Sequence, residues 1–204
     1  MFMRAVFLSL FVISIASLTA CSGASQNTDP IVVLDTTSGS IEITVYPDKA
    51  PISAADFLRY VDDGLYTDSG FYRTVHAGND PREMGMSLIQ GGRLDREIVG
   101  EPIEHELTTD TGMSNKGGAV AIARDEPGTG SATYFFINIG NNDFLDTGGI
   151  RNSDGQGYAT FARVTKGMDV VREIQKMETI ADEDPVTPNQ TLAKPVIITR
   201  AYRK

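Results

Sequence analysis

The stretch GFYRTVHAGNDPREMGMSLIQGG, residues 70–92, decides how the rest of the chain is interpreted. Its two ends, residues 71–75 and 88–90, are short and rich in apolar residues, and they predict two strands. Arg73 lies in the first strand and Gln90 in the second. On these residues alone, Arg73 fits a surface salt bridge and Gln90 fits a polar group that bonds a neighbouring loop. The segments on either side decide whether the pair has a function.

Upstream of this stretch, the sequence predicts a β-hairpin followed by a helix. Residues 31–34 form an apolar run, residues 37–39 a turn, and apolar residues alternate with polar ones over 41–45. Residues 51–60 then change to helical spacing. Ser53 with Asp56 resembles a capping box for this helix, and Gly64 suits its C-terminus.

Downstream, short strands predominate, and one more helix is expected over residues 168–177. Further strands are expected at 119–123, 134–139, 159–164 and 196–202. Many strands, with one helix near each end of the chain, predict a mainly β fold: a closed antiparallel barrel capped by two helices. Neither an internal repeat nor a second linker interrupts residues 30–204, which are therefore expected to form one domain.

The first 29 residues predict an exported, lipid-anchored protein. Residues 1–20 carry one charge, Arg4, and an apolar run of 14 residues (5–18) that is short for a bilayer span but suits a signal peptide. The run leads into LTAC, which resembles a bacterial lipobox and contains the only cysteine of the chain, Cys21. Cys21 is the predicted lipidation site, and residues 21–29 are the predicted flexible tether. The alternative is an ordinary secretory signal with an accidental cysteine.

The residue after Cys21 indicates which membrane the lipoprotein would reach. Lipoproteins with Ser22 rather than aspartate at this position usually go to the outer membrane, where the domain would face the periplasm. The anchor thus makes the membrane one expected partner, and a monomer is the expected state of the domain.

The net charge of the chain limits which other classes of partner are expected. The chain has 18 Lys and Arg against 27 Asp and Glu, a net charge of −9, and loss of Arg4 with the signal peptide makes this −10. Such a surface repels phosphate backbones, so nucleic acid is not an expected partner. The two histidines lack metal-site spacing and no cofactor motif is present, so neither a metal nor a cofactor is expected.

Seven strings along the chain resemble, in order, those of the cyclophilin family of peptidyl-prolyl cis-trans isomerases. They are YPDKAP with ADFLRYVDDGLY, GFYR, IQGG, AIAR, YFFIN, FLD and GYATFARV, which begin at residues 46, 55, 70, 89, 121, 134, 144 and 157. The resemblance covers about residues 31–203 and implies an eight-stranded barrel. It also implies an activity, the acceleration of X–Pro isomerisation during the folding of exported, proline-containing polypeptides.

The resemblance assigns roles to individual residues. Arg73 would be the main catalytic side chain, because its permanent charge and fixed donors suit the prolyl nitrogen of a twisted amide. Gln90 would bond the substrate backbone and align the arginine. The substrate-binding positions are Leu88, Phe136, Leu145 and Tyr158 around the proline ring, Phe144 at a site often filled by tryptophan, and Ala123 with the backbone of Arg124.

Departures from the family pattern leave two alternatives open. The connection 76–87 is longer than usual, Ser87 replaces a common phenylalanine, and Tyr134 stands where glutamine is common. Met84 or Met86 could fill the space beside Ser87. One alternative is a cyclophilin-fold module or chaperone that binds prolyl segments with little turnover, and another is a structural lipoprotein that docks through the insertion. The presence of both Arg73 and Gln90 favours the enzyme.

Overall fold

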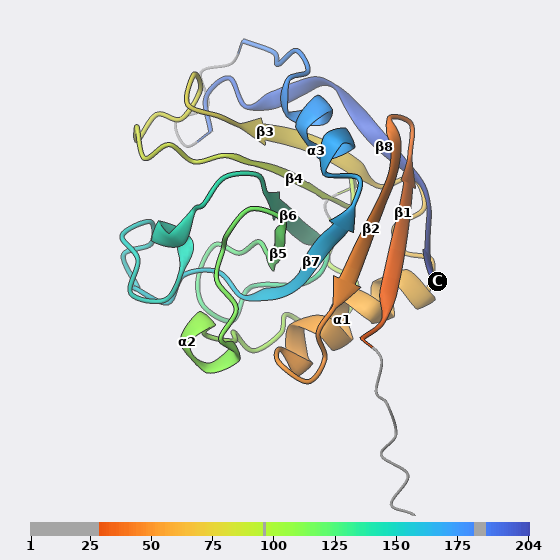
Figure 1. Cartoon of the computed structure of the whole chain (residues 1–204), viewed down its shortest axis with the longest axis vertical. Coiled ribbons are helices and arrows are strands. Elements are labelled where there is room, and N and C mark those ends of the chain that lie inside the picture. Colours follow the sequence, from red (N-terminus) through yellow and green to blue (C-terminus); the bar gives the residue numbers. More distant parts are fainter. Residues whose placement is uncertain (1–28, 96, 182–186) are drawn as a thin grey trace, which may run out of the picture.

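The computed structural model describes residues 29–95, 97–181 and 187–204, and in these its eight strands close into one antiparallel barrel (Figure 1). Around the barrel the order is β1, β2, β7, β5, β6, β4, β3 and β8, and β8 pairs with β1 to close the ring. The predicted fold is therefore confirmed. The strands are β1 Ile31–Thr36, β2 Gly39–Val45, β3 Gly70–Val75, β4 Leu88–Gly92, β5 Ala119–Ile122, β6 Tyr134–Asn138, β7 Thr160–Lys166 and β8 Thr191–Arg203.

Two helices cover the ends of the barrel, as predicted. Helix α1, Pro51–Asp62, packs against β7 and β8, and α3, Met168–Gln175, packs against β2, β3 and β4 (Figure 1). The short helix α2, Thr108–Thr111, and the 3-10 helix η1, Asp143–Leu145, lie in long connections and were not expected. Within the described residues, no helix combines the length and apolar character needed to cross a bilayer.

The start of α1 corrects one expectation, because the predicted capping box is wrong. No side chain of the helix caps its N-terminus; instead the carboxylate of Glu106 accepts hydrogen bonds from the N–H groups of Ile52 (3.0 Å) and Ser53 (2.8 Å). A carboxylate there also suits the helix dipole. The Asp56 carboxylate points elsewhere and accepts a hydrogen bond from the Ala132 N–H at 2.7 Å.

The interior of the barrel is filled with apolar side chains. The ring centroid of Phe57, from α1, lies 4.9 Å from that of Phe161 and 5.6 Å from that of Phe135. In β2, Ile41 and Ile43 are fully buried, as the alternation in the sequence predicts. Because a small barrel packed in this way has no room inside, a ligand must bind on its outer wall.

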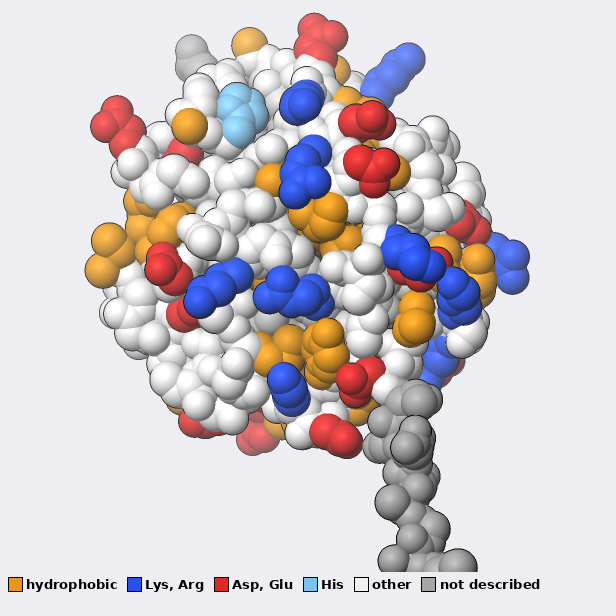
Figure 2. All heavy atoms as spheres, in the orientation of Figure 1, with side chains coloured by type: hydrophobic (Ala, Val, Ile, Leu, Met, Phe, Trp, Pro, Cys, Tyr) orange, Lys and Arg blue, Asp and Glu red, His pale blue; other side chains and the backbone are white. Residues whose placement is uncertain are grey.

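The outer face of β3, β4, β6 and β5 carries a second apolar cluster. Successive residues alternate between the two faces, so Ile89 and Phe135 belong to the interior while Leu88 and Phe136 face outward. The outer cluster consists of Val75, Met86, Leu88, Ala121, Phe136 and Leu145, with Ala123, Phe144 and Tyr158 packed against it. Figure 2 shows hydrophobic side chains exposed between charged ones on one face of the molecule.

Candidate active site

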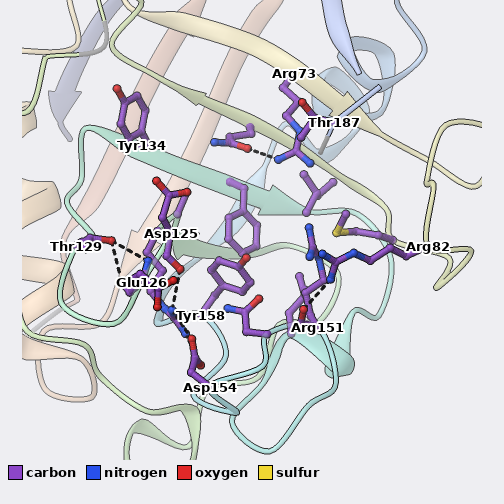
Figure 3. A pocket seen from close by; sticks show the side chains of 18 of the residues that line it. Arg73, Arg82, Asp125, Glu126, Thr129, Tyr134, Arg151, Asp154, Tyr158 and Thr187 are labelled. Carbon is purple, nitrogen blue, oxygen red and sulfur yellow. Dashed lines mark hydrogen bonds and ion pairs between the residues drawn. The ribbon is translucent and has the colours of Figure 1, made fainter. Parts of the chain in front are cut away.

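An open groove of about 680 Å³ lies over the outer cluster (Figure 3). Strand register aligns three of its residues with a fourth from the outer cluster: Arg73 of β3 opposes Gln90 of β4, Gln90 opposes Phe136 of β6, and Phe136 opposes Ala121 of β5. Directly opposed residues present their side chains on one face of a sheet. The two predicted catalytic residues and the predicted pocket residue Phe136 therefore form a single row.

The backbone of β3 is irregular where it presents Arg73. Its register shifts between Phe71 and Arg73 against both neighbouring strands, β4 and β8. Strict alternation would put these two residues on the same face, but a β-bulge re-aims the side chains that follow it. As a result Phe71 is fully buried, while Tyr72 and Arg73 both line the groove.

Two glutamine side chains hold the Arg73 guanidinium. Nη1 donates to Gln90 Oε1 at 2.6 Å, whereas Nε and Nη2 donate to Gln190 Oε1 at 2.9 and 2.6 Å. Gln90 Nε2 in turn donates to the Tyr72 hydroxyl at 3.0 Å, which directs the amide oxygen toward the arginine. Gln90 therefore stands where it would align Arg73, and the catalytic role of the pair stays a prediction.

Gln190 is a site residue that sequence reasoning missed. It is 1% exposed and precedes β8, and its backbone oxygen accepts a hydrogen bond from the Thr74 N–H at 2.9 Å. Its Nε2 donates to the backbone oxygen of Asn79 at 2.8 Å, so its other amide atom, Oε1, faces the arginine. Gln190 is 117 residues from Arg73, and only the pairing of β8 with β3 brings the two together. No local pattern marks it.

Replacing Gln190 with alanine is expected to lower kcat for a prolyl peptide about tenfold, with a smaller change in KM. The change removes the acceptor of two charge-assisted hydrogen bonds, and about 1.4 kcal/mol of lost alignment corresponds to that factor. Steady-state kinetics with one peptide would measure both constants. Thr199→Ala, at an exposed position of β8, is the control and should keep the unaltered kcat. An unchanged kcat in folded Gln190→Ala protein would contradict the positioning role.

The predicted pocket residues come together beside the arginine. Leu88, Phe136, Leu145 and Tyr158 all line the groove, and the Phe136 and Tyr158 rings meet edge to face with centroids 5.4 Å apart. Phe144 packs against the outer cluster but does not line the groove. The result is an apolar surface suited to a proline ring.

Met86 occupies the wall where Ser87 departs from the family pattern. The Ser87 hydroxyl accepts a hydrogen bond from Gln175 Nε2 at 2.9 Å, which turns it toward α3. Met86 is 5% exposed, belongs to the outer cluster and lines the groove. Of the two methionines considered from the sequence, Met86 therefore fills this space.

Buried amide side chains support the other side of the pocket. With the partly buried carboxylate of Asp146 they form the Asn115 network, which consists of Asn115, Asn138, Asn142 and Asp146. Asn115 is fully buried, and its Nδ2 donates to the backbone oxygens of Leu145 (3.3 Å) and Tyr158 (3.1 Å) and to Asp146 Oδ1 (2.9 Å). Satisfied polar networks of this kind hold one conformation. The network thus fixes two pocket residues from positions that the sequence analysis did not select.

The Arg124 side chain has a structural task. Only 1% of it is exposed, and it forms an ion pair with Asp154 at 2.9 Å while Nε and Nη2 donate to the Gly157 oxygen at 3.0 and 2.6 Å. Hydrogen bonds from Arg124 hold the pKa of the Asp154 carboxyl below its ordinary value. The Arg124 side chain therefore anchors the segment before Tyr158, which leaves its backbone, with Ala123, for the predicted substrate contact at the groove.

Comparison with known proteins decides the family. Residues 31–202 match the family model described as cyclophilin type peptidyl-prolyl cis-trans isomerase/CLD. The chain belongs to the cyclophilin family. It is 32% identical to peptidyl-prolyl cis-trans isomerase A of Dickeya dadantii, over 93% of each chain. It is 34% identical to peptidyl-prolyl cis-trans isomerase B of Escherichia coli, over 73% of this chain and 86% of that one.

This cyclophilin also shares its fold with solved structures. A cyclophilin type peptidyl-prolyl cis-trans isomerase of Cryptosporidium parvum superposes with a TM-score of 0.63 at 16% identity, covering 86% of this chain and 98% of that one. Together the family and its bacterial relatives place this cyclophilin in the peptidyl-prolyl cis-trans isomerase class, as the sequence predicts. The predicted lipidation site, Cys21, lies outside the described residues.

Proposed function

We propose that this cyclophilin accelerates X–Pro isomerisation in exported polypeptides, from a membrane to which a lipid on Cys21 anchors it. The observation that carries the enzymatic part is the row formed by Arg73, Gln90 and Phe136, which puts a held guanidinium beside an apolar pocket. A module that only binds prolyl segments needs the pocket but not the charge.

The reaction needs no bond to be made or broken. The partial double bond of the amide sets a barrier of roughly 18–20 kcal/mol, so uncatalysed exchange takes tens to hundreds of seconds. An acceleration of about 10⁵ requires lowering that barrier by roughly 7 kcal/mol. In the twisted transition state resonance is lost and the prolyl nitrogen gains a lone pair. A cationic donor aimed at that nitrogen stabilises this state more than either planar one.

The residues of the groove divide this task. The proline ring would rest on Phe136, Leu88 and Leu145, because burial of an apolar ring favours binding without polar contacts. Arg73 would donate to the prolyl nitrogen, and Gln90 and Gln190 would hold the guanidinium in place during the rotation. Prior placement of a donor in this way avoids reorganisation at the moment of reaction.

The full chain in detergent is expected to catalyse isomerisation of a short X–Pro peptide well above the uncatalysed rate. A protease-coupled or exchange-NMR assay would measure kcat/KM. Binding of the peptide without turnover would contradict the enzymatic proposal and favour the alternative function, a prolyl-peptide-binding module.

The proposed anchor has its own test. The string LTAC around the only cysteine supports lipidation, and Ser22 supports the outer membrane of a cell that has one. Several acyl chains together give stable membrane attachment where a single one is marginal. Cys21→Ser protein should lose acyl chains and leave the membrane fraction while keeping isomerase activity. Mass spectrometry that finds an unmodified Cys21 in protein taken from membranes would contradict the anchor.

A further inference from the structure

The connection between β3 and β4, residues 76–87, forms an ordered wall of the groove, held by its own side-chain hydrogen bonds. Asp80 is 6% exposed, and its carboxylate accepts hydrogen bonds from the backbone N–H groups of Arg82 (3.2 Å), Met84 (3.0 Å) and Met86 (3.1 Å). Asn79 accepts one from the His76 N–H at 2.8 Å. Side chains that bond their own loop in this manner fix its backbone. The side chains of the connection therefore hold defined places.

This wall reaches the groove at two residues, Met86 and Arg82. Met86 completes the apolar pocket. Arg82 lines the groove farther out, and its Nη1 donates to the backbone oxygen of Arg151 at 2.9 Å. The Arg151 side chain also lines the groove, and Figure 3 shows the two arginines together on one side of it.

The two arginines are paired with no carboxylate of the described residues. Across the described residues, neither guanidinium forms an ion pair. Of the carboxylates near them in the loop, Asp80 is occupied with backbone N–H groups and Glu83 is exposed. The other side of the groove is acidic, with exposed Asp125 and Glu126 (Figure 3). On a chain of net charge −9, two neighbouring arginines beside the pocket are a local exception.

We propose that Arg82 and Arg151 form a subsite for an acidic side chain that flanks the proline of the substrate. This subsite rests on the proposed isomerase function, because that function places the proline ring of the substrate in the adjacent apolar pocket. Guanidinium groups bind carboxylates through paired N–H donors, and two of them side by side fit an aspartate or glutamate. The acidic opposite wall repels the same side chain, so the groove selects how a charged substrate lies.

A peptide series tests the subsite on the unaltered full chain. Glutamate, glutamine or lysine is placed immediately before the proline, or at the first or second position after it. At one of these positions, kcat/KM for glutamate is expected to exceed that for glutamine by about three- to tenfold, in line with two partly exposed ion pairs. Lysine there should fall below glutamine. The preference should shrink toward one at about 1 M salt, where the screening length is about 3 Å.

Variants of the two arginines test whether they cause the preference for glutamate over glutamine. Arg82→Gln and Arg151→Gln should each lower the glutamate-to-glutamine ratio, whereas Arg172→Gln, which removes the same charge from exposed α3, should keep it. Equal kcat/KM for glutamate and glutamine at every position would overturn the subsite while leaving the isomerase function intact. Glutamate-selective binding without turnover, measured by fluorescence anisotropy, would support the subsite and overturn the isomerase function.

Discussion

Replacing Arg73 with alanine is expected to lower kcat/KM for a prolyl peptide at least about 100-fold, a loss of about 2.7 kcal/mol of transition-state stabilisation. The guanidinium is the cation that two glutamine oxygens hold beside the apolar pocket, and alanine removes it without blocking the groove. Because an interaction made mainly in the transition state is lost, kcat should account for most of the change. Steady-state kinetics on an X–Pro peptide would separate the two constants.

Two controls show whether the lower kcat/KM comes from lost transition-state stabilisation rather than from unfolding or from a change of surface charge. Urea unfolding of the Arg73→Ala protein should remain cooperative, because the side chain lies in the groove rather than in the barrel core. Arg172→Ala, on the exposed surface of α3, should keep the unaltered kcat/KM. If folded Arg73→Ala protein retained full activity, Arg73 would have no place in the mechanism.

Replacing Asn115 with alanine is expected to lower the free energy of unfolding by about 3 kcal/mol, as is typical when a buried polar network is broken. Asn115 is fully buried, and its side chain donates to the backbone oxygens of Leu145 and Tyr158 while accepting a hydrogen bond from Asn138 at 3.2 Å. The change removes these hydrogen bonds from buried groups and opens a cavity. Urea unfolding with a common m-value would measure the loss.

The same variant should also raise KM, because Leu145 and Tyr158 shape the pocket. Asn141→Ala is the matched control: Asn141 is exposed on the connection between β6 and η1 and should change stability by less than about 0.5 kcal/mol. A stability equal to that of the unaltered protein would show that the Asn115 network does not hold this side of the groove.

Local patterns predicted the elements of the barrel because each strand buries one face. Alternation over residues 41–45 marked β2, and helical spacing after Pro51 marked α1. Closure was a different kind of inference, since nothing local says that β8 pairs with both β1 and β3. The number of strands, with one helix near each end of the chain, suggested it, and the order of strings shared with the cyclophilins implied eight strands.

The site was predictable to the extent that it lies in those strings. Arg73 and Gln90 belong to two of them, and strand register brings the two side chains together. Gln190 and Asn115 act through contacts made only in the folded barrel, so their sequence neighbours carry no signal. The capping error has the same origin, because Glu106, 54 residues from Ile52, outcompetes the local pattern.

The closed ring of strands bears on how such a protein can work among unfolded chains. Every strand of the ring has a hydrogen-bonded neighbour on both sides, so the described barrel offers no free sheet edge. An exposed edge is a template on which an extended polypeptide can add as a further strand, which leads to aggregation. An extended polypeptide substrate can therefore bind in the groove, but it cannot add to the described barrel as a further strand. For the proposed function, the architecture would let the protein handle polypeptides before they fold without becoming a nucleus for their assembly.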